Sequence, residues 1–339
     1  TEAMPVLVEA RAQGHDQSWG GLDIRTFLSG EQSAGRFSVH SIVLAPGASL
    51  PPSYHVDAHA YYLVVDGDGV ELQIGKLVDK VEPRAMGYAP PLTRQGLRNG
   101  SARAATVLAV YSPAGVERAF EEAHAYGERT GAPAGTDYQA ILSRYGFRFD
   151  DAPLENDDLT NVPGPGLEFE ISGPGDMEAL RRAFSQLPAH PRLVRTPQSE
   201  FETAAPGVTF RKQLLVGEDS AGQAMINLLG GEPGMGAPPH HQPTEEEFFF
   251  IVRGQLRMTC ATETKVLDPG AFAFCPRNCT HGFKNLHPSE RTTFITLNSP
   301  AGHERSMVAV RQLRQKGASP EKINALSADG GFIWHQPPV

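Results

Sequence analysis

The feature that most constrains this fold is an internal repeat that spans most of the chain. Residues 47–67 have the same spacing of flanking glycines as residues 234–254, and each pair of matching glycines is 187 positions apart. Residues 82–99 match residues 268–285 at an offset of 186 positions. The phrase SPAGVER follows the first copy and SPAGHER follows the second. A shared offset sustained over about 70 residues predicts a tandem duplication of one fold.

Both copies contain short segments rich in β-branched and aromatic residues. The 35 glycines and 28 prolines supply the turns between them. Regularly spaced short strands with such turns predict a β-sandwich or jelly-roll barrel in each copy. The expected strands are residues 40–46, 60–67, 70–75 and 105–112 in the first copy, and 210–217, 225–231, 247–254, 255–260, 271–276 and 291–299 in the second.

Helical patterns follow the strands of each copy. Asp176 is the expected N-cap of one helix, and Ser319 followed by Pro320 is the expected start of another. The expected helices are residues 116–129, 138–145, 176–186, 306–316 and 320–326. The acidic, turn-rich stretch 150–166 marks the junction between copies. We therefore predict an N-terminal domain at residues 1–155 and a C-terminal domain at residues 156–339, each preceded or followed by a few peripheral helices.

The second copy concentrates candidate metal ligands. His240, Glu247 and His281 lie in or beside expected strands. A carboxylate inside a barrel is costly unless it is paired or bound to a metal, which favours a ligand role for Glu247. Two imidazoles and one carboxylate make a facial triad, which leaves coordination positions open for substrate or dioxygen.

The spacing of these residues resembles the two motifs of the cupin family. Residues 234–254 follow G-x5-H-x-H-x(3,4)-E-x6-G, and residues 270–285 follow G-x5-P-x-G-x2-H-x3-N. Gln242 stands where the second histidine is expected, and Asn278 stands where the second motif has glycine. The resemblance covers both copies and implies an all-β bicupin, with two tandem cupin jelly-roll barrels. It also implies that His240, Glu247 and His281 bind a metal in the C-terminal barrel.

The fourth position of this site stays open. Alternate residues of a strand face the same side, so Gln242 shares a face with His240, whereas His241 points away unless the Pro238-Pro239 entry contains a bulge. Gln242, or His241 in its place, could complete the metal site. The competing interpretation is a hydrogen-bonded cluster of His240, Glu247 and His281 without metal.

Apolar residues are expected to line a substrate pocket beside these ligands. The candidates are Phe249, Ile251, Phe283 and Cys275. Few arginines or lysines lie near the expected strands, so an aromatic or enolic small molecule fits this lining better than a sugar phosphate.

The first copy has lost most of these ligands. Ser53, His55, Ala60 and Gln95 occupy the positions of His240, Gln242, Glu247 and His281. Only one imidazole remains, so we expect no metal in the N-terminal barrel.

Three functions are compatible with these motifs. The first is a dioxygenase-like oxidoreductase, resembling the quercetin 2,3-dioxygenase-like bicupins, acting on a flavonol- or polyketide-like substrate with Glu247 as catalytic base. The expected cofactor is one divalent metal ion, Fe(II) first, with nickel, manganese, cobalt or zinc as alternatives. The second is a metal-dependent isomerase, cyclase or lyase without redox chemistry. The third is a non-catalytic cupin that binds a small molecule.

The net charge limits which partners the protein is expected to bind, and the cysteine content indicates its cellular compartment. The net charge of −9 and the pI of about 5.7 argue against nucleic-acid binding. No apolar stretch is long enough to cross a membrane. The three cysteines and the absence of an apolar signal core predict a cytoplasmic protein with reduced thiols. A homodimer is the expected assembly, by the resemblance alone.

Overall fold

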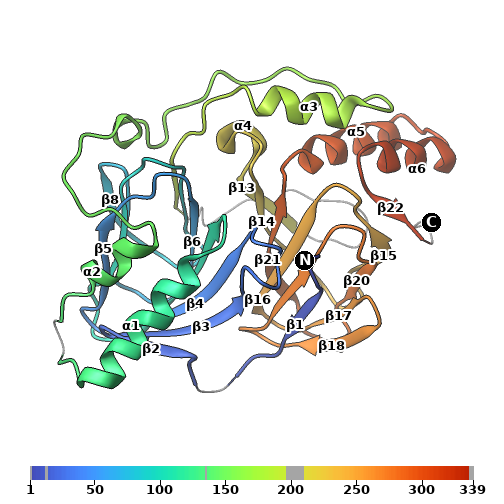
Figure 1. The fold of residues 1–339 in the computed structure, drawn as a ribbon. Coiled ribbons are helices and arrows are strands. Elements are labelled where there is room, and N and C mark those ends of the chain that lie inside the picture. Colours follow the sequence, from blue (N-terminus) through green and yellow to red (C-terminus); the bar gives the residue numbers. More distant parts are fainter. Residues whose placement is uncertain (1, 12–13, 134–135, 196–209, 336–339) are drawn as a thin grey trace. The chain divides into compact units, whose positions relative to one another are not determined.

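The computed structural model describes residues 2–11, 14–133, 136–195 and 210–335. These residues cluster into two compact units, whose segments alternate along the chain (Figure 1). Unit 1 comprises Thr1–Ala3, Ala12–Val162 and His190–Gln198, and unit 2 comprises Met4–Arg11, Pro163–Ala189 and Ser199–Val339. The continuous division at residues 155 and 156 stays a prediction about domain organisation.

Unit 1 contains two antiparallel sheets of described strands. One sheet has the order β12-β9-β6-β11-β4-β3-β2 and the other has the order β5-β10-β7-β8. The strands are β2 (Gln17–Trp19), β3 (Leu22–Leu28), β4 (Ser38–Leu44), β5 (Ser49–Ser53), β6 (His59–Asp66), β7 (Val70–Ile74), β8 (Leu77–Val81), β9 (Met86–Ala89), β10 (Gln95–Asn99), β11 (Ala105–Ser112) and β12 (Arg192–Val194).

Unit 2 repeats this arrangement. Its described strands form one sheet with the order β1-β19-β16-β21-β14-β13 and another with the order β18-β17-β20-β15-β22. The strands are β1 (Val6–Val8), β13 (Phe210–Leu215), β14 (Met225–Gly231), β15 (Gly236–His241), β16 (Glu246–Arg253), β17 (Leu256–Cys260), β18 (Glu263–Leu267), β19 (Phe272–Cys275), β20 (His281–Lys284), β21 (Thr292–Ser299) and β22 (Ile333–Trp334).

The two strand orders match element by element. β9-β6-β11-β4-β3 of unit 1 corresponds to β19-β16-β21-β14-β13 of unit 2, and β5-β10-β7-β8 corresponds to β15-β20-β17-β18. The duplication predicted from the 187-residue offset is therefore confirmed. In the equivalent outer position, β12 pairs with β9 in unit 1 and the N-terminal strand β1 pairs with β19 in unit 2. Figure 1 shows the blue strand β1 among the orange strands.

Alternating burial explains why these segments form half-buried strands. In β17, Leu256, Met258 and Cys260 are buried, while Arg257 and Thr259 between them are not. Successive strand residues point to opposite faces, so the apolar set of β17 meets the apolar sets of neighbouring strands in one core. This packing produces a separate apolar core inside each unit.

Helices follow the last long strand of each unit, and two further helices of unit 2 come earlier in the chain. The helices are α1 (Val116–Thr130), α2 (Gln139–Leu142), η1 (Ser143–Tyr145) and η2 (Glu155–Asp158) in unit 1, and α3 (Asp176–Phe184), α4 (Gly217–Ser220), α5 (His303–Gln315) and α6 (Pro320–Asp329) in unit 2. The Ser319 side chain accepts a hydrogen bond from the Lys322 backbone N–H, so the predicted cap of α6 is confirmed. No helix among the described residues is long and apolar enough to span a membrane.

The predicted N-cap of α3 is wrong by one residue. Gly175 is the N-cap, with φ of 84°, and Asp176 is the first helical residue. The Asp176 carboxylate instead accepts hydrogen bonds from the backbone N–H groups of Ser172 and Gly173, at 2.8 and 3.0 Å. Asp176 therefore closes the turn before the helix and does not cap the helix itself.

The glutamate shared by the phrases SPAGVER and SPAGHER has the same structural role in both units. In each unit, one buried glutamate accepts hydrogen bonds from two glycine backbone N–H groups and ties the start of a helix to an earlier loop. These sets are Glu117 with Gly30 and Gly115, and Glu304 with Gly217 and Gly302. In both units the buried carboxylate is thus paired with backbone donors, and its position in the repeated phrase is the same.

Candidate metal centre

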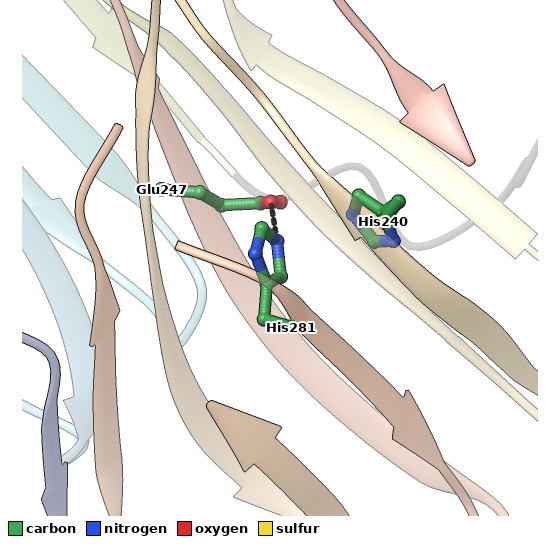
Figure 2. Close-up of side chains that lie close together, drawn as sticks. All are labelled: His240, Glu247 and His281. Carbon is green, nitrogen blue, oxygen red and sulfur yellow. Dashed lines mark hydrogen bonds and ion pairs between the residues drawn. The ribbon is translucent and has the colours of Figure 1, made fainter. Parts of the chain in front are cut away.

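His240, Glu247 and His281 come together inside unit 2 (Figure 2). Each offers one ligand atom, and these three atoms lie within 4.8 Å of one another. His240 is in β15, His281 begins β20, and the pairing of these strands places the two histidines opposite each other. Glu247 reaches the same point from β16 in the other sheet. The sequence-predicted triad is thus one spatial cluster that joins both sheets of the barrel.

The backbone selects which ring nitrogen of each histidine faces this point. His240 Nδ1 lies 2.9 Å from the carbonyl oxygen of Pro238, and His281 Nδ1 lies 3.0 Å from that of Cys279. A carbonyl can only accept, so each Nδ1 carries the proton and donates it. In a neutral ring, the Nε2 lone pair is then free for a ligand. Metal-binding histidines in proteins are held in this way.

The spacing of the three atoms suits one ion. Ligands about 2.1 Å from a shared ion lie no more than about 4.2 Å apart, so the observed limit of 4.8 Å requires only small side-chain adjustments. His281 Nε2 lies 3.1 Å from Glu247 Oε2, and the imidazole rings of His240 and His281 have centroids 4.3 Å apart. His240 and His281 are each 1% exposed. The residues present therefore fit a buried mononuclear metal centre.

The two imidazoles have opposite electrostatic environments. Burial, and secondly the proximity of His281, lower the pKa of His240 well below its ordinary value. Burial also lowers the pKa of His281, but the hydrogen bond and charge of Glu247 outweigh it, and the pKa of His281 is raised. His240 is thus kept neutral, which is the form that binds a metal ion, whereas His281 would have to release its Nε2 proton, which Glu247 stabilises, before that nitrogen could bind an ion.

Gln242 lies directly after β15 and is buried. Its amide nitrogen donates a hydrogen bond to Glu245 Oε1. Its amide oxygen, Oε1, is buried and has no hydrogen-bond partner among the described residues. A buried oxygen without a hydrogen-bond partner is expected where a bound ion or molecule supplies the missing contact. Gln242 Oε1 meets this condition two residues after His240.

His241 lies on the other face of the strand. Its Nδ1 is 2.8 Å from Nε2 of His335, and its backbone pairs with Ile333 of β22. Within the described residues, His241 is not part of the cluster whose ligand atoms lie within 4.8 Å of one another. This arrangement favours Gln242 over His241 as the residue that completes the site.

Glu245 is a buried carboxylate that the sequence analysis missed. It is 1% exposed and accepts hydrogen bonds from Asn298 Nδ2 at 3.1 Å and Arg181 Nη2 at 2.9 Å. Burial raises the pKa of Glu245 to about 8, and the Arg181 guanidinium opposes that shift. The three groups that contact this carboxylate, Gln242 Nε2, Asn298 Nδ2 and Arg181 Nη2, all donate, which is the pattern of the ionised form. A cation bound nearby would lower this pKa further. Glu245 precedes β16, and the adjacent Glu246 is buried as well, so strand alternation could not have singled it out.

The candidate pocket residues pack mainly against each other. Phe249, Ile251 and Cys275 are buried in the core of unit 2, and Phe283 is half-buried against it. The rings of Phe249 and Phe283 have centroids 5.5 Å apart. Phe249 is the one of the four whose ring lies near a triad imidazole, with its centroid 6.2 Å from that of His281. Contact between these residues and a substrate stays a prediction.

A different aromatic pair lies beside the triad. The ring of Phe332 stacks on His240 with a centroid distance of 4.0 Å, and Trp334 lies 5.1 Å from the same imidazole. Both belong to the segment after α6, where β22 extends the sheet next to β15. No motif in the sequence indicated that this C-terminal segment returns to the site.

All three cysteines gather next to the triad. Cys260 Sγ lies 3.2 Å from Cys275 Sγ and 3.4 Å from Cys279 Sγ, and all three are free thiols. The hydrogen bond between Cys260 and Cys275, followed by burial, raises the pKa of Cys260, and burial raises that of Cys275. Thiols with raised pKa values react slowly, so these side chains act as packing groups under the site.

The two residues that depart from the cupin motifs, Asn278 and Gln242, have different consequences for the structure. Asn278 has φ of 62°, and asparagine is the residue other than glycine that best tolerates this left-handed conformation. The equivalent residue of unit 1, Leu92, also has positive φ, 60°. Asn278 therefore preserves the turn before His281. Gln242 in contrast changes the chemistry of the site.

The corresponding point in unit 1 has no ligand cluster among the described residues. Gln95 Oε1 accepts a hydrogen bond from the Tyr62 hydroxyl, which lies 3.2 Å from that of Tyr111. His55 packs against Phe147, with ring centroids 4.5 Å apart, and burial lowers its pKa to about 4. Tyrosines and a phenylalanine thus fill the space that the triad occupies in unit 2.

Comparisons with known proteins agree with this architecture. Residues 229–297 match the family model described as a cupin domain. An oxalate decarboxylase variant from Bacillus subtilis superposes with a TM-score of 0.53 and 15% identity, covering 99% of this chain and 90% of that chain. The Ylba protein of Escherichia coli superposes with a TM-score of 0.56 and 8% identity, covering 88% and 92%. No curated protein matches the sequence.

These similarities establish the fold. The matched cupin domain contains His240, Glu247 and His281, and the superpositions extend over both units. The chain therefore has a bicupin fold, as the repeat and the two motifs predict. At 8–15% identity the likeness to solved structures concerns architecture only.

Proposed function

We propose that the C-terminal barrel is the mononuclear metal centre of an enzyme that acts on a small molecule. His240, Glu247 and His281 hold the ion, and the amide oxygen of Gln242 is the fourth protein ligand. The observation that carries this proposal is the convergence of three ligand atoms within 4.8 Å while both Nδ1–H groups are tied to backbone carbonyls. Fe(II) is the first candidate, because two imidazoles and one carboxylate are the ligand set of non-haem iron oxygenases.

The proposed reaction is a dioxygenation of an enolic or aromatic substrate. A bound divalent ion would polarise a substrate oxygen and lower its pKa. Two neutral imidazoles, one carboxylate and one neutral amide leave a divalent site with net positive charge, which favours an anionic substrate oxygen. Glu247 is positioned to accept the substrate hydroxyl proton at Oε2, since this carboxylate faces the same point as both imidazoles. Phe332 and Trp334 exclude water from the His240 side.

A reaction without redox chemistry is the second candidate. The Glu247 side chain is 12% exposed, whereas that of His281 is 1% exposed, so the carboxylate is the more accessible of the two for proton transfer. A base beside a Lewis acid suits an isomerase or lyase as well as an oxygenase. The superposable oxalate decarboxylase of Bacillus subtilis is described with Mn(II) centres, which supports manganese as an alternative metal. A homodimer remains a prediction for this chain.

Metal content measured by mass spectrometry tests the proposal. We expect about one ion per chain in the wild-type protein, its loss in His240→Ala and His281→Ala, and its retention in the matched control His241→Ala. Two ions per chain would contradict the expectation that unit 1 binds no metal. No bound ion after reconstitution with iron, manganese, nickel, cobalt or zinc would overturn the metalloenzyme.

Oxygen uptake separates the two reaction classes. With flavonol-like and enolic compounds, the dioxygenase predicts oxygen consumption that requires the metal and disappears in Glu247→Ala. Turnover under anaerobic conditions would favour the isomerase or lyase. Stoichiometric metal and ligand binding without turnover would leave a non-catalytic binding protein.

A further inference from the structure

We propose that Glu245 is a positioning residue that fixes the Gln242 amide so that its oxygen faces the metal ion. This inference rests on the proposed metal site and concerns a carboxylate that is not itself a ligand. It explains how a glutamine can stand at a position where the cupin motif has histidine. An amide has a donor end and an acceptor end, so only one of its two orientations presents oxygen to a cation.

The hydrogen bonds around Glu245 select that orientation. Gln242 Nε2 donates to Glu245 Oε1, so the amide nitrogen is occupied and the amide oxygen is directed away from the carboxylate. Asn298 Nδ2 donates to the same carboxylate oxygen at 3.1 Å. With the nitrogen held in this way, Gln242 Oε1 is left buried and without a hydrogen-bond partner among the residues described. A buried unpaired oxygen is costly unless a bound group completes it.

Glu245 is in turn held from the other side. Arg181 of α3 donates through Nη2 to Glu245 Oε2 at 2.9 Å, through Nη1 to Thr244 Oγ1 at 2.6 Å, and through Nε to the Ala301 carbonyl at 3.1 Å. A guanidinium with three separate acceptors has little freedom to rotate. The Glu245 carboxylate is therefore held in one position, and its hydrogen bond with Gln242 Nε2 holds the Gln242 amide in one orientation.

A pre-set amide oxygen matters because amide oxygen is a weaker ligand than imidazole. In a flexible glutamine, the cost of ordering the side chain would cancel part of the gain from coordination. Groups that orient metal ligands typically change metal affinity by about 10–100-fold when they are removed. We expect an effect at the lower end of this range for Glu245.

A double-mutant cycle with Co(II) as the probe tests this role. Co(II) affinity is measured by competition with a chromogenic chelator, and its visible absorption reports the ligand geometry. Glu245→Gln should weaken Co(II) binding about tenfold, since the new amide can accept or donate and no longer selects one orientation of Gln242. Gln242→Met, which keeps side-chain volume but removes the oxygen, should weaken binding by a similar factor and change the spectrum in the same way.

The combined variant distinguishes positioning from a general loss of negative charge. In the Gln242→Met background, Glu245→Gln should change the Co(II) affinity less than twofold, because there is no amide oxygen left to orient. A purely electrostatic role would instead persist at full size in that background. Glu246→Gln is the matched control, since it removes the same charge from the adjacent residue, whose Oε1 lies 4.0 Å from Arg277 Nε. We expect less than a twofold change in this control.

The outcomes separate this inference from the proposed function. Suppose that the wild-type protein binds Co(II), that His240→Ala does not, and that the effects of Glu245→Gln and Gln242→Met are additive. This result would support the metal centre but would refute the positioning role of Glu245. An unchanged affinity in Gln242→Met would refute it as well, even if Glu245→Gln does not fold. Wild-type protein that binds no metal at all would remove both proposals.

Discussion

His281 Nε2 lies 3.1 Å from Glu247 Oε2, although the two residues stand in different sheets of unit 2. The pair therefore joins the two sheets of the barrel at one point, with His240 opposite (Figure 2). Contacts that join the two sheets depend on the whole barrel, so this site cannot form from either sheet alone. The stability of the barrel and the properties of the site are consequently linked.

Removal of the Glu247 charge should abolish tight metal binding. In Glu247→Gln, the only carboxylate of the triad is replaced by a neutral amide of the same shape, so we expect affinity for divalent cations to fall at least about 100-fold. Isothermal titration with Mn(II) measures the change. Glu246→Gln is the control with the same loss of charge. Equal affinities for wild type and Glu247→Gln would show that Glu247 is not a ligand.

Restoring histidine at residue 242 should strengthen metal binding. Imidazole is a stronger ligand for Co(II) and Ni(II) than an amide oxygen, and Glu245 can accept a hydrogen bond from the second ring nitrogen. We expect Gln242→His to bind Co(II) about tenfold more tightly in chelator competition. The control is Pro243→His, which adds a histidine next to residue 242. The residue on the other side, His241, is already histidine. A weaker site in Gln242→His would mean that residue 242 does not face the ion.

The aromatic cover of the site should contribute to stability. Phe332 stacks on His240 at 4.0 Å and on His303 at 4.9 Å. Because Phe332 is only half-buried, we expect Phe332→Ala to lower the free energy of unfolding by about 1–2 kcal/mol in urea denaturation. The variant should also release bound Zn(II) to excess chelator faster than wild type. Release at the wild-type rate would show that the ring does not cover the metal.

The repeat and the metal triad were predictable because their signals are local. Glycines fix the turns at constant spacing, and strand alternation fixes which side chains share a face, so local patterns are enough to predict that His240, Glu247 and His281 lie together. The surroundings of Gln242 were not predictable. Arg181 and Phe332 lie 61 and 90 positions from Gln242 along the chain, and only the tertiary fold brings them to the site.

The capping error at Asp176 has a similar origin. An aspartate before an amphipathic segment can cap the helix or close the preceding turn, and both roles satisfy its carboxylate. The turn from Ser172 to Gly175 decides between them, because Gly175 adopts positive φ and takes the cap position. Sequence alone does not contain that backbone conformation.

Buried histidines should make unit 1 sensitive to acid. His40 in β4 is fully buried, with Nδ1 3.0 Å from Thr26 Oγ1 and Nε2 3.1 Å from Ser38 Oγ. Burial lowers the pKa of His40 to about 3, whereas a histidine in the unfolded chain has its ordinary value of 6.5. Between these two values the unfolded state binds a proton that the folded state does not bind. Stability therefore falls as the pH decreases from 6.5 towards 3, by up to about 1.4 kcal/mol per pH unit for this one group.

Thermal unfolding between pH 7.0 and 5.0 measures this contribution. The wild-type melting temperature should fall below pH 6.5, and His40→Gln should show a smaller fall over the same interval, because glutamine can keep hydrogen bonds to Thr26 and Ser38 without titrating. Burial also lowers the pKa of His55 and His59, each to about 4, so part of the pH dependence should persist in the variant. His15→Gln, at an exposed histidine, is the surface control. Parallel curves for wild type and His40→Gln would mean that His40 does not contribute to the loss of stability in acid.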